Sequence, residues 1–158
     1  MNNNCLNAAN SLIQIVTSST SSLVTCSTTM ALDDTIPQNT EGDEILTATI
    51  TPTNVNNLLE IEFTCFIHKD ANAGARIVAL FQDATLNALC AVADVKVAAS
   101  RGECIYLHYT MTAGTTSATT FKIRIGGVTA DLYVNGDSTG RLMGGVGNTR
   151  LTIKEFVS

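Results

Sequence analysis

The stretch NLLEIEFTCFIH, residues 57–68, carries the clearest structural signal in the sequence. Apolar residues recur at every second position along it, and successive side chains of a β-strand point to opposite faces of a sheet. The first set is Leu59, Ile61, Phe63, Cys65 and Ile67, and the positions between them hold Glu60, Glu62, Thr64, Phe66 and His68. The pattern predicts a long strand with one buried face.

Strand signals continue on both sides of this stretch, at intervals of roughly ten to fifteen residues. We expect strands near 12–17, near 22–30, and within 44–52, 76–83, 103–114, 120–127, 129–140 and 140–158. Residues 84–100 are rich in alanine, but β-branched Val92, Val95 and Val97 favour two short strands joined by a loop. Asn135-Gly136 predicts a tight hairpin turn. Without a convincing helix, the pattern indicates an all-β, antiparallel jelly-roll sandwich.

The length and composition of the chain fit one ordinary domain. The chain has 158 residues, of which 45% are hydrophobic and 15% charged, against a typical charged share of about 25%. Its net charge of −5 and the lack of a Lys/Arg cluster argue against nucleic-acid binding. Residues 1–12 lack the features of a secretion signal, and no apolar run is long enough to cross a membrane, so we expect folding in a cytoplasm.

The cysteines do not form a metal or redox motif. They are Cys5, Cys26, Cys65, Cys90 and Cys104, and no two lie close enough in sequence for a CxxC pattern. Cys65 and Cys104 stand in apolar stretches, where a thiol behaves as a small hydrophobe. We expect all five to be reduced in a cytoplasmic protein.

The loop LDDTIPQNTEGDE, residues 32–44, concentrates acidic residues in a chain that is poor in charge. Its carboxylates, Asp33, Asp34, Glu41, Asp43 and Glu44, are suitable calcium ligands. Their spacing does not match an EF-hand, and inter-strand loops are often acidic. We therefore expect a solvated turn in which Asp33 or Asp34 caps the backbone, without a bound metal.

Catalytic motifs are lacking, and we expect neither enzymatic activity nor a cofactor. The only histidines are His68 and His108, without a nucleophile elbow nearby. GGVGN, residues 144–148, lacks the spacing and the following helix of a phosphate-binding loop, so its glycines predict a turn. Nothing selects Glu60, Glu62 or Asp83 as paired catalytic carboxylates.

Several aromatic and aliphatic residues fall on strand faces that should meet water. Phe66 and His68 share one such face, Tyr106 and His108 share another, and Val78 and Leu80 lie in a run without polar alternation. A second buried surface in a small sandwich is most simply a subunit interface. We predict that Phe66, His68, Tyr106 and His108 belong to it.

Four separated segments, in order, resemble a domain of tailed-bacteriophage virion proteins. They contain IPQNTEGDE (36–44), ALFQD (79–83), MTAGTTSATTFKIR (111–124) and the closing pattern from Gly144 to Glu155. The resembling domain is a jelly roll related in shape to tumour-necrosis-factor and C1q heads, and it assembles as a trimer. The resemblance covers about residues 13–156 and therefore implies a homotrimer. The stretch ADVKVAASRGECIYL has no match in it.

The resemblance implies a virion protein without specifying its task, because phages reuse the domain on heads, appendages and fibres. Our first hypothesis is a homotrimeric capsid decoration or cement protein that binds the major capsid protein at threefold or local threefold positions. It would consist of a flexible attachment tail, residues 1–12, and a jelly-roll domain, residues 13–158. The candidate attachment residues are Asn4, Cys5, Leu6, Leu12 and Ile13.

The alternative is a receptor-binding tip or adhesin module of a tail or head fibre. Its contacts with host glycans would come from loops of the rigid sandwich, namely residues 68–75 and 112–119.

Overall fold

The structure is a computed structural model that describes residues 10–69, 74–96, 101–129 and 131–158. Its strands are β1 (Leu12–Thr20), β2 (Val24–Cys26), β3 (Asp43–Ile50), β4 (Leu58–Lys69), β5 (Gly74–Gln82), β6 (Cys90–Lys96), β7 (Arg101–Thr112), β8 (Thr119–Gly127), β9 (Leu132–Val134), β10 (Gly136–Asp137), β11 (Gly140–Arg141) and β12 (Thr149–Phe156). The helical element in the described part is one 3-10 turn, η1 (Met143–Gly145).

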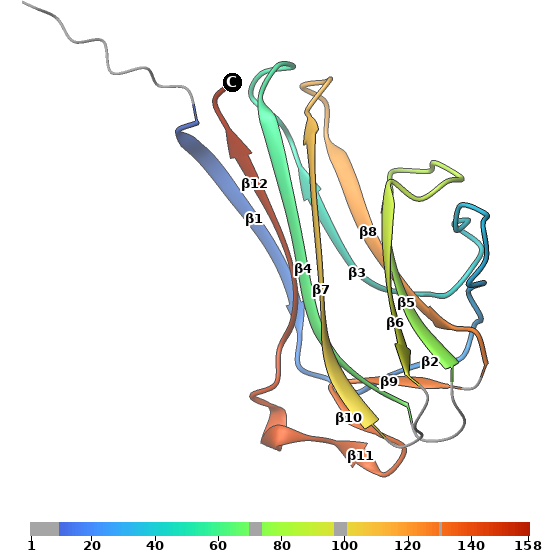
Figure 1. Cartoon of the computed structure of the whole chain (residues 1–158). Coiled ribbons are helices and arrows are strands. Elements are labelled where there is room, and N and C mark those ends of the chain that lie inside the picture. Colours follow the sequence, from blue (N-terminus) through green and yellow to red (C-terminus); the bar gives the residue numbers. More distant parts are fainter. Residues whose placement is uncertain (1–9, 70–73, 97–100, 130) are drawn as a thin grey trace, which may run out of the picture.

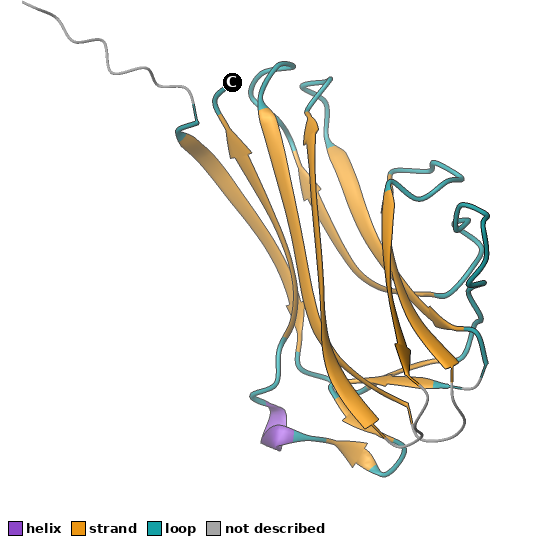
Figure 2. Ribbon diagram, in the orientation of Figure 1, coloured by secondary structure: helices purple, strands orange, loops and turns teal. Residues whose placement is uncertain are grey.

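Two antiparallel sheets face each other and form a sandwich (Figures 1 and 2). Sheet 1 has the order β1-β12-β4-β9-β2, and β7 pairs with the other side of β4. Sheet 2 has the order β3-β8-β5-β6, while β10 and β11 form a small separate hairpin. Neighbours such as β12 and β4 are far apart in sequence, so the chain crosses between the sheets as a jelly roll requires.

The main core lies between the two sheets and confirms the alternation predicted for residues 57–68. Leu59, Ile61, Phe63 and Ile67 are fully buried on the inner face of β4. They pack in one cluster with inward residues of the other strands, including Phe121, Ile123, Leu151 and Ile153. Burying these large side chains contributes roughly 1.5–3 kcal/mol each, which makes this layer the main source of stability.

Strand β5 is covered on both faces, and both covers belong to the same chain. Val78 and Leu80 enter the main core, whereas Ile77 and Phe81 point the other way. A second cluster formed with Met30 buries this outer side. The apolar run at residues 77–81 is therefore explained by packing within the protomer, and attributing Val78 and Leu80 to a subunit interface was wrong.

Replacing Met30 with alanine should destabilise the fold by about 2–3 kcal/mol, because Met30 is fully buried over β5 and its loss leaves a cavity there. Chemical denaturation of the variant measures this loss. Leu32→Ala is the matched control, since Leu32 lies in the same loop with its side chain exposed. Equal losses of stability in the two variants would show that burial of Met30 against the outer side of β5 does not stabilise the fold.

Two local predictions were wrong. Residues 90–96 form a single strand, β6, where two short strands were expected, and residues 97–100 lie outside the described part. Asn135-Gly136 is not the hairpin turn, because Asn135 is buried between β9 and β10 and the turn falls at residues 137–140. The glycines of GGVGN do form a turn, with positive φ at Gly144 and Gly145.

Candidate functional site

The outward face of sheet 1 carries an array of polar and aromatic side chains. Strand register sets their positions, since residues directly opposite one another on antiparallel strands point to the same side. Three rows cross β12, β4 and β7: Lys154–Glu60–Thr110, Thr152–Glu62–His108, and Arg150–Thr64–Tyr106. We call these nine residues the sheet face.

A lysine in the middle of the sheet face bridges two glutamates. Lys154 Nζ donates to Glu60 Oε1 at 2.7 Å and also to Glu62 Oε2. The hydrogen bonds to the two carboxylates raise the pKa of Lys154, and the bond from Lys154 is the main reason that the pKa of Glu62 is lowered. The hydrogen bonds from Lys154 to the two carboxylates fix the positions of the three side chains.

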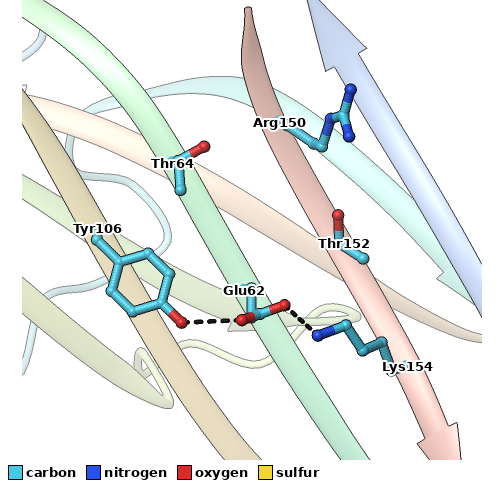
Figure 3. A pocket seen from close by; sticks show the side chains of 6 residues that line it. All are labelled: Glu62, Thr64, Tyr106, Arg150, Thr152 and Lys154. Atoms are coloured by element: carbon cyan, nitrogen blue, oxygen red, sulfur yellow. Dashed lines mark hydrogen bonds and ion pairs between the residues drawn. The ribbon is translucent and has the colours of Figure 1, made fainter.

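Tyr106 extends this network across β7 (Figure 3). Its hydroxyl donates to Glu62 Oε1 at 2.9 Å, and its ring lies parallel to that of His108, with centroids 6.3 Å apart. Partial desolvation and the bond to Glu62 raise the pKa of Tyr106. The side chain is nevertheless 53% exposed, so an aromatic ring with a fixed orientation faces solvent.

Beside Tyr106 the sheet face is hollowed. The depression has a volume of about 330 Å³ and is lined by Glu62, Thr64, Tyr106, Arg150, Thr152 and Lys154 (Figure 3). Arg150 is exposed at its edge, and no ion pair joins it to the described residues. The hollow therefore offers a partner an aromatic ring, hydroxyl groups and one available guanidinium.

The four residues predicted for a subunit interface lie on the outward side of β4 and β7. Tyr106 and His108 are within the sheet face, and Phe66 and His68 continue the outward side of β4 toward its end. The Phe66 ring lies so close over Gly102 that a β-carbon there would be 2.0 Å from Phe66 Cζ. The Phe66 ring therefore packs partly against its own protomer, whereas the Tyr106 side chain is more exposed to solvent.

The predicted attachment residues are only partly within the described structure. Leu12 and Ile13 open β1, and their side chains are exposed. Leu58 and Ile15, which are also exposed, lie on the neighbouring outward rows, so this end of sheet 1 is apolar. Asn4, Cys5 and Leu6 lie outside the described residues.

The acidic loop uses its carboxylates to fasten its own backbone. Asp33 accepts hydrogen bonds from the backbone N–H and the hydroxyl of Thr35, which confirms the predicted capping turn and holds the pKa of Asp33 low. Asp43 accepts from the N–H groups of Ser27 and Thr28. Across the described residues, no group of three or more His, Cys, Asp and Glu side chains is arranged to hold a metal ion.

The two loops proposed for glycan contacts are far apart. Lys69 pairs with Arg101 at one end of the β4–β7 ladder, and Leu58 pairs with Thr112 at the other. Residues 70–73 of the first loop lie outside the described residues. Its described start at Lys69 and the start of the loop at 112–119 lie at opposite ends of the β4–β7 ladder.

The four described cysteines are free thiols. Cys26 and Cys65 are buried, and burial raises the pKa of Cys26 to about 12. Cys104 is exposed on the outward side of β7, so describing it as a buried hydrophobe was wrong. Within the described part, none of the elements is a helix long and apolar enough to cross a membrane.

Comparison with known proteins establishes the fold class. No protein-family model and no curated protein sequence matches the chain. Among solved structures it is similar to Eiger TNF from S. frugiperda, with a TM-score of 0.52, 8% sequence identity, and coverage of 93% of this chain and 94% of that one. The molecule is therefore an antiparallel jelly-roll domain of the shape found in Eiger TNF, as the sequence predicted.

A second similarity is to a chain in the structure of infectious bursal disease virus Gt strain. Its TM-score is 0.49 at 11% identity, and the match covers 95% of this chain but 39% of that chain.

Proposed function

We propose that this protein is a non-enzymatic structural component of a bacteriophage virion, a homotrimer that decorates the capsid at threefold or local threefold positions. The sequence resemblance to phage virion domains supports the virion assignment, and the fold shared with Eiger TNF is compatible with it. A trimer matches the symmetry of such positions on a shell. The major capsid protein would be the partner.

The sheet face is the proposed contact between protomers, and the network around Tyr106 is the observation that carries it. The Lys154 ammonium pairs with the carboxylates of Glu60 and Glu62 before any partner arrives, which reduces the cost of removing these groups from water. Exposed tyrosine is enriched in the cores of protein interfaces, where its ring adds apolar area and its hydroxyl retains a hydrogen bond.

Tyr106→Arg should convert the trimer to monomers, because it places a cation where the three protomers would meet. We expect at least about a hundredfold weaker association, measured by sedimentation velocity over a range of concentrations. The thermal unfolding midpoint of the isolated protomer should change little, since Tyr106 is exposed there. Val146→Arg is the control, because that residue is 86% exposed in the loop before β12 and is not one of the nine residues of the sheet face. A trimer that survives Tyr106→Arg would place the interface elsewhere.

Co-sedimentation tests the role in the virion. Purified protein is mixed separately with phage heads emptied of DNA and with susceptible host cells. Saturable binding to heads, at a stoichiometry in multiples of three, is the expected result. Binding to cells alone would contradict it and favour the receptor-binding alternative.

A further inference from the structure

A second surface, on the other side of the molecule, is formed by two loops that are locked together. They are residues 31–42, between β2 and β3, and residues 83–89, between β5 and β6, which we call the loop pair (Figure 1, right). Backbone bonds join Asn39 N–H to the Leu86 carbonyl at 2.8 Å and Ala88 N–H to the Pro37 carbonyl at 3.0 Å. The Gln38 amide also donates to Asn87 Oδ1 at 2.9 Å.

Further contacts, with β8, within the loop itself and with β5, also hold the loop pair in place. Arg124 on β8 donates to the carbonyl oxygens of Glu41 and Gly42 at 2.8 and 2.7 Å. The half-buried Glu41 carboxylate accepts from Gln38 N–H of its own loop at 2.7 Å. Met30 and Ala88 pack against the outer side of β5. These contacts hold the loop pair in one conformation before any partner binds.

Despite this order, the loop pair leaves three large aliphatic side chains in solvent. Leu32 is 50% exposed, Ile36 54% and Leu86 59%. Aliphatic side chains on a pre-ordered surface lose little further backbone entropy on binding, so burying them against a partner is favourable.

The charges around these side chains indicate the chemistry of the partner. Residues 31–42 and 83–89 contain Asp33, Asp34, Glu41 and Asp83 and lack Lys and Arg. The Glu41 carboxylate is engaged by the loop backbone, whereas Asp33 and Asp34 are exposed between Leu32 and Ile36 and Asp83 is exposed in the second loop. A complementary surface would offer an apolar depression rimmed by Lys or Arg.

We infer that the loop pair is the surface by which each protomer docks onto another virion protein, through an apolar depression with a basic rim. This rests on the proposed function for the existence of a virion partner. It assigns the attachment to ordered loops on sheet 2, in addition to the residues at the start of the chain. The sheet face stays available for contacts between protomers.

The experiment measures binding of purified wild-type protein and three variants to emptied phage heads by co-sedimentation. The variants are Ile36→Asp/Leu86→Asp, Asp34→Lys, and Val146→Asp as a matched control on an exposed aliphatic residue elsewhere. Sedimentation mass and unfolding midpoint are recorded for each, so that loss of binding can be separated from loss of fold or of the trimer.

We expect the double variant to bind heads at least about tenfold more weakly and Asp34→Lys several-fold more weakly, with mass and midpoint retained. Binding of the wild-type protein should weaken as the salt concentration rises from about 50 to 500 mM. Binding of Asp34→Lys should weaken less steeply over the same range. If the wild-type protein binds heads and both loop-pair variants bind with the same affinity, the inference is overturned and the proposed function stays intact. Lack of wild-type binding to heads would overturn both.

Discussion

Replacing Glu155 with alanine should destabilise the folded protein by about 3–5 kcal/mol, the largest single effect that we expect. The Glu155 side chain is 0% exposed, and it lies on β12 within the sandwich. One carboxylate oxygen accepts from Thr53 N–H at 2.7 Å, the Thr53 hydroxyl at 2.9 Å and the Asn57 amide at 2.6 Å. The other oxygen accepts from the Gln14 amide on β1.

Removing this carboxylate would leave the buried Asn57 amide and the partly buried donors of Thr53 and Gln14 without this acceptor, and it would release the loop at residues 51–57 from β12. Urea denaturation at neutral pH measures the loss. Glu44→Ala is the matched control, because Glu44 is exposed and its ion pairs with Lys122 and Arg124 are long, at 3.9 and 3.7 Å. The control should lose less than about 1 kcal/mol. Similar losses in both variants would contradict the role assigned to Glu155.

Glu155 also gives the fold a defined acid sensitivity. Burial raises its pKa, but the hydrogen bonds from Gln14, Asn57 and Thr53 outweigh that effect and lower the pKa from 4.5 to about 2. A carboxyl with a depressed pKa in the folded state contributes stability above pH 4.5 that is lost as the pH falls toward 2. The contribution is roughly 3 kcal/mol, and it should be missing from the pH profile of Glu155→Gln.

Replacing Asn135 with alanine should cost about 3 kcal/mol, the second large effect. Asn135 is buried with φ of 61°, a conformation that asparagine tolerates better than alanine. Its amide donates to the carbonyl oxygens of Thr20 and Ser22 at 3.0 and 3.1 Å, and its oxygen accepts from the Thr149 hydroxyl at 2.9 Å. One side chain thus joins the end of β1, the start of β12 and the β9–β10 junction.

Asn135→Gly separates the two causes, since glycine accepts the positive φ but cannot make the side-chain bonds. We expect the glycine variant to lose most of what the alanine variant loses, measured by thermal unfolding. Near wild-type stability of Asn135→Gly would show that backbone strain, and not the hydrogen bonds, decides the effect.

Glu155 and Asn135 also show which features of the structure could not be predicted from the sequence. The alternation in residues 57–68 predicted both faces of β4, because the period of a strand is fixed by its backbone. The same period places Glu155 on the inward side with Leu151 and Ile153, which was the available signal for a buried carboxylate. Its donors come from residues 14, 53 and 57, and only the folded register brings them together.

The candidate interface was partly predictable for the same reason. The alternation of side chains along a strand placed Tyr106 and His108 on the outward side, and the structure confirms that placement. The charge network needed the pairing of β12 with β4, which puts Lys154 directly opposite Glu60. Asn135 was misread because Asn-Gly also marks hairpin turns, and its tertiary partners outweighed that local preference.

Sedimentation equilibrium of the purified wild-type protein tests the central claim most directly. A homotrimer built through the sheet face predicts a mass three times the protomer mass of 16.7 kDa at micromolar concentration. The mass should return to one protomer in Tyr106→Arg. A wild-type protein that remains at the protomer mass throughout the concentration range would contradict the trimer and the assignment of the sheet face to contacts between protomers.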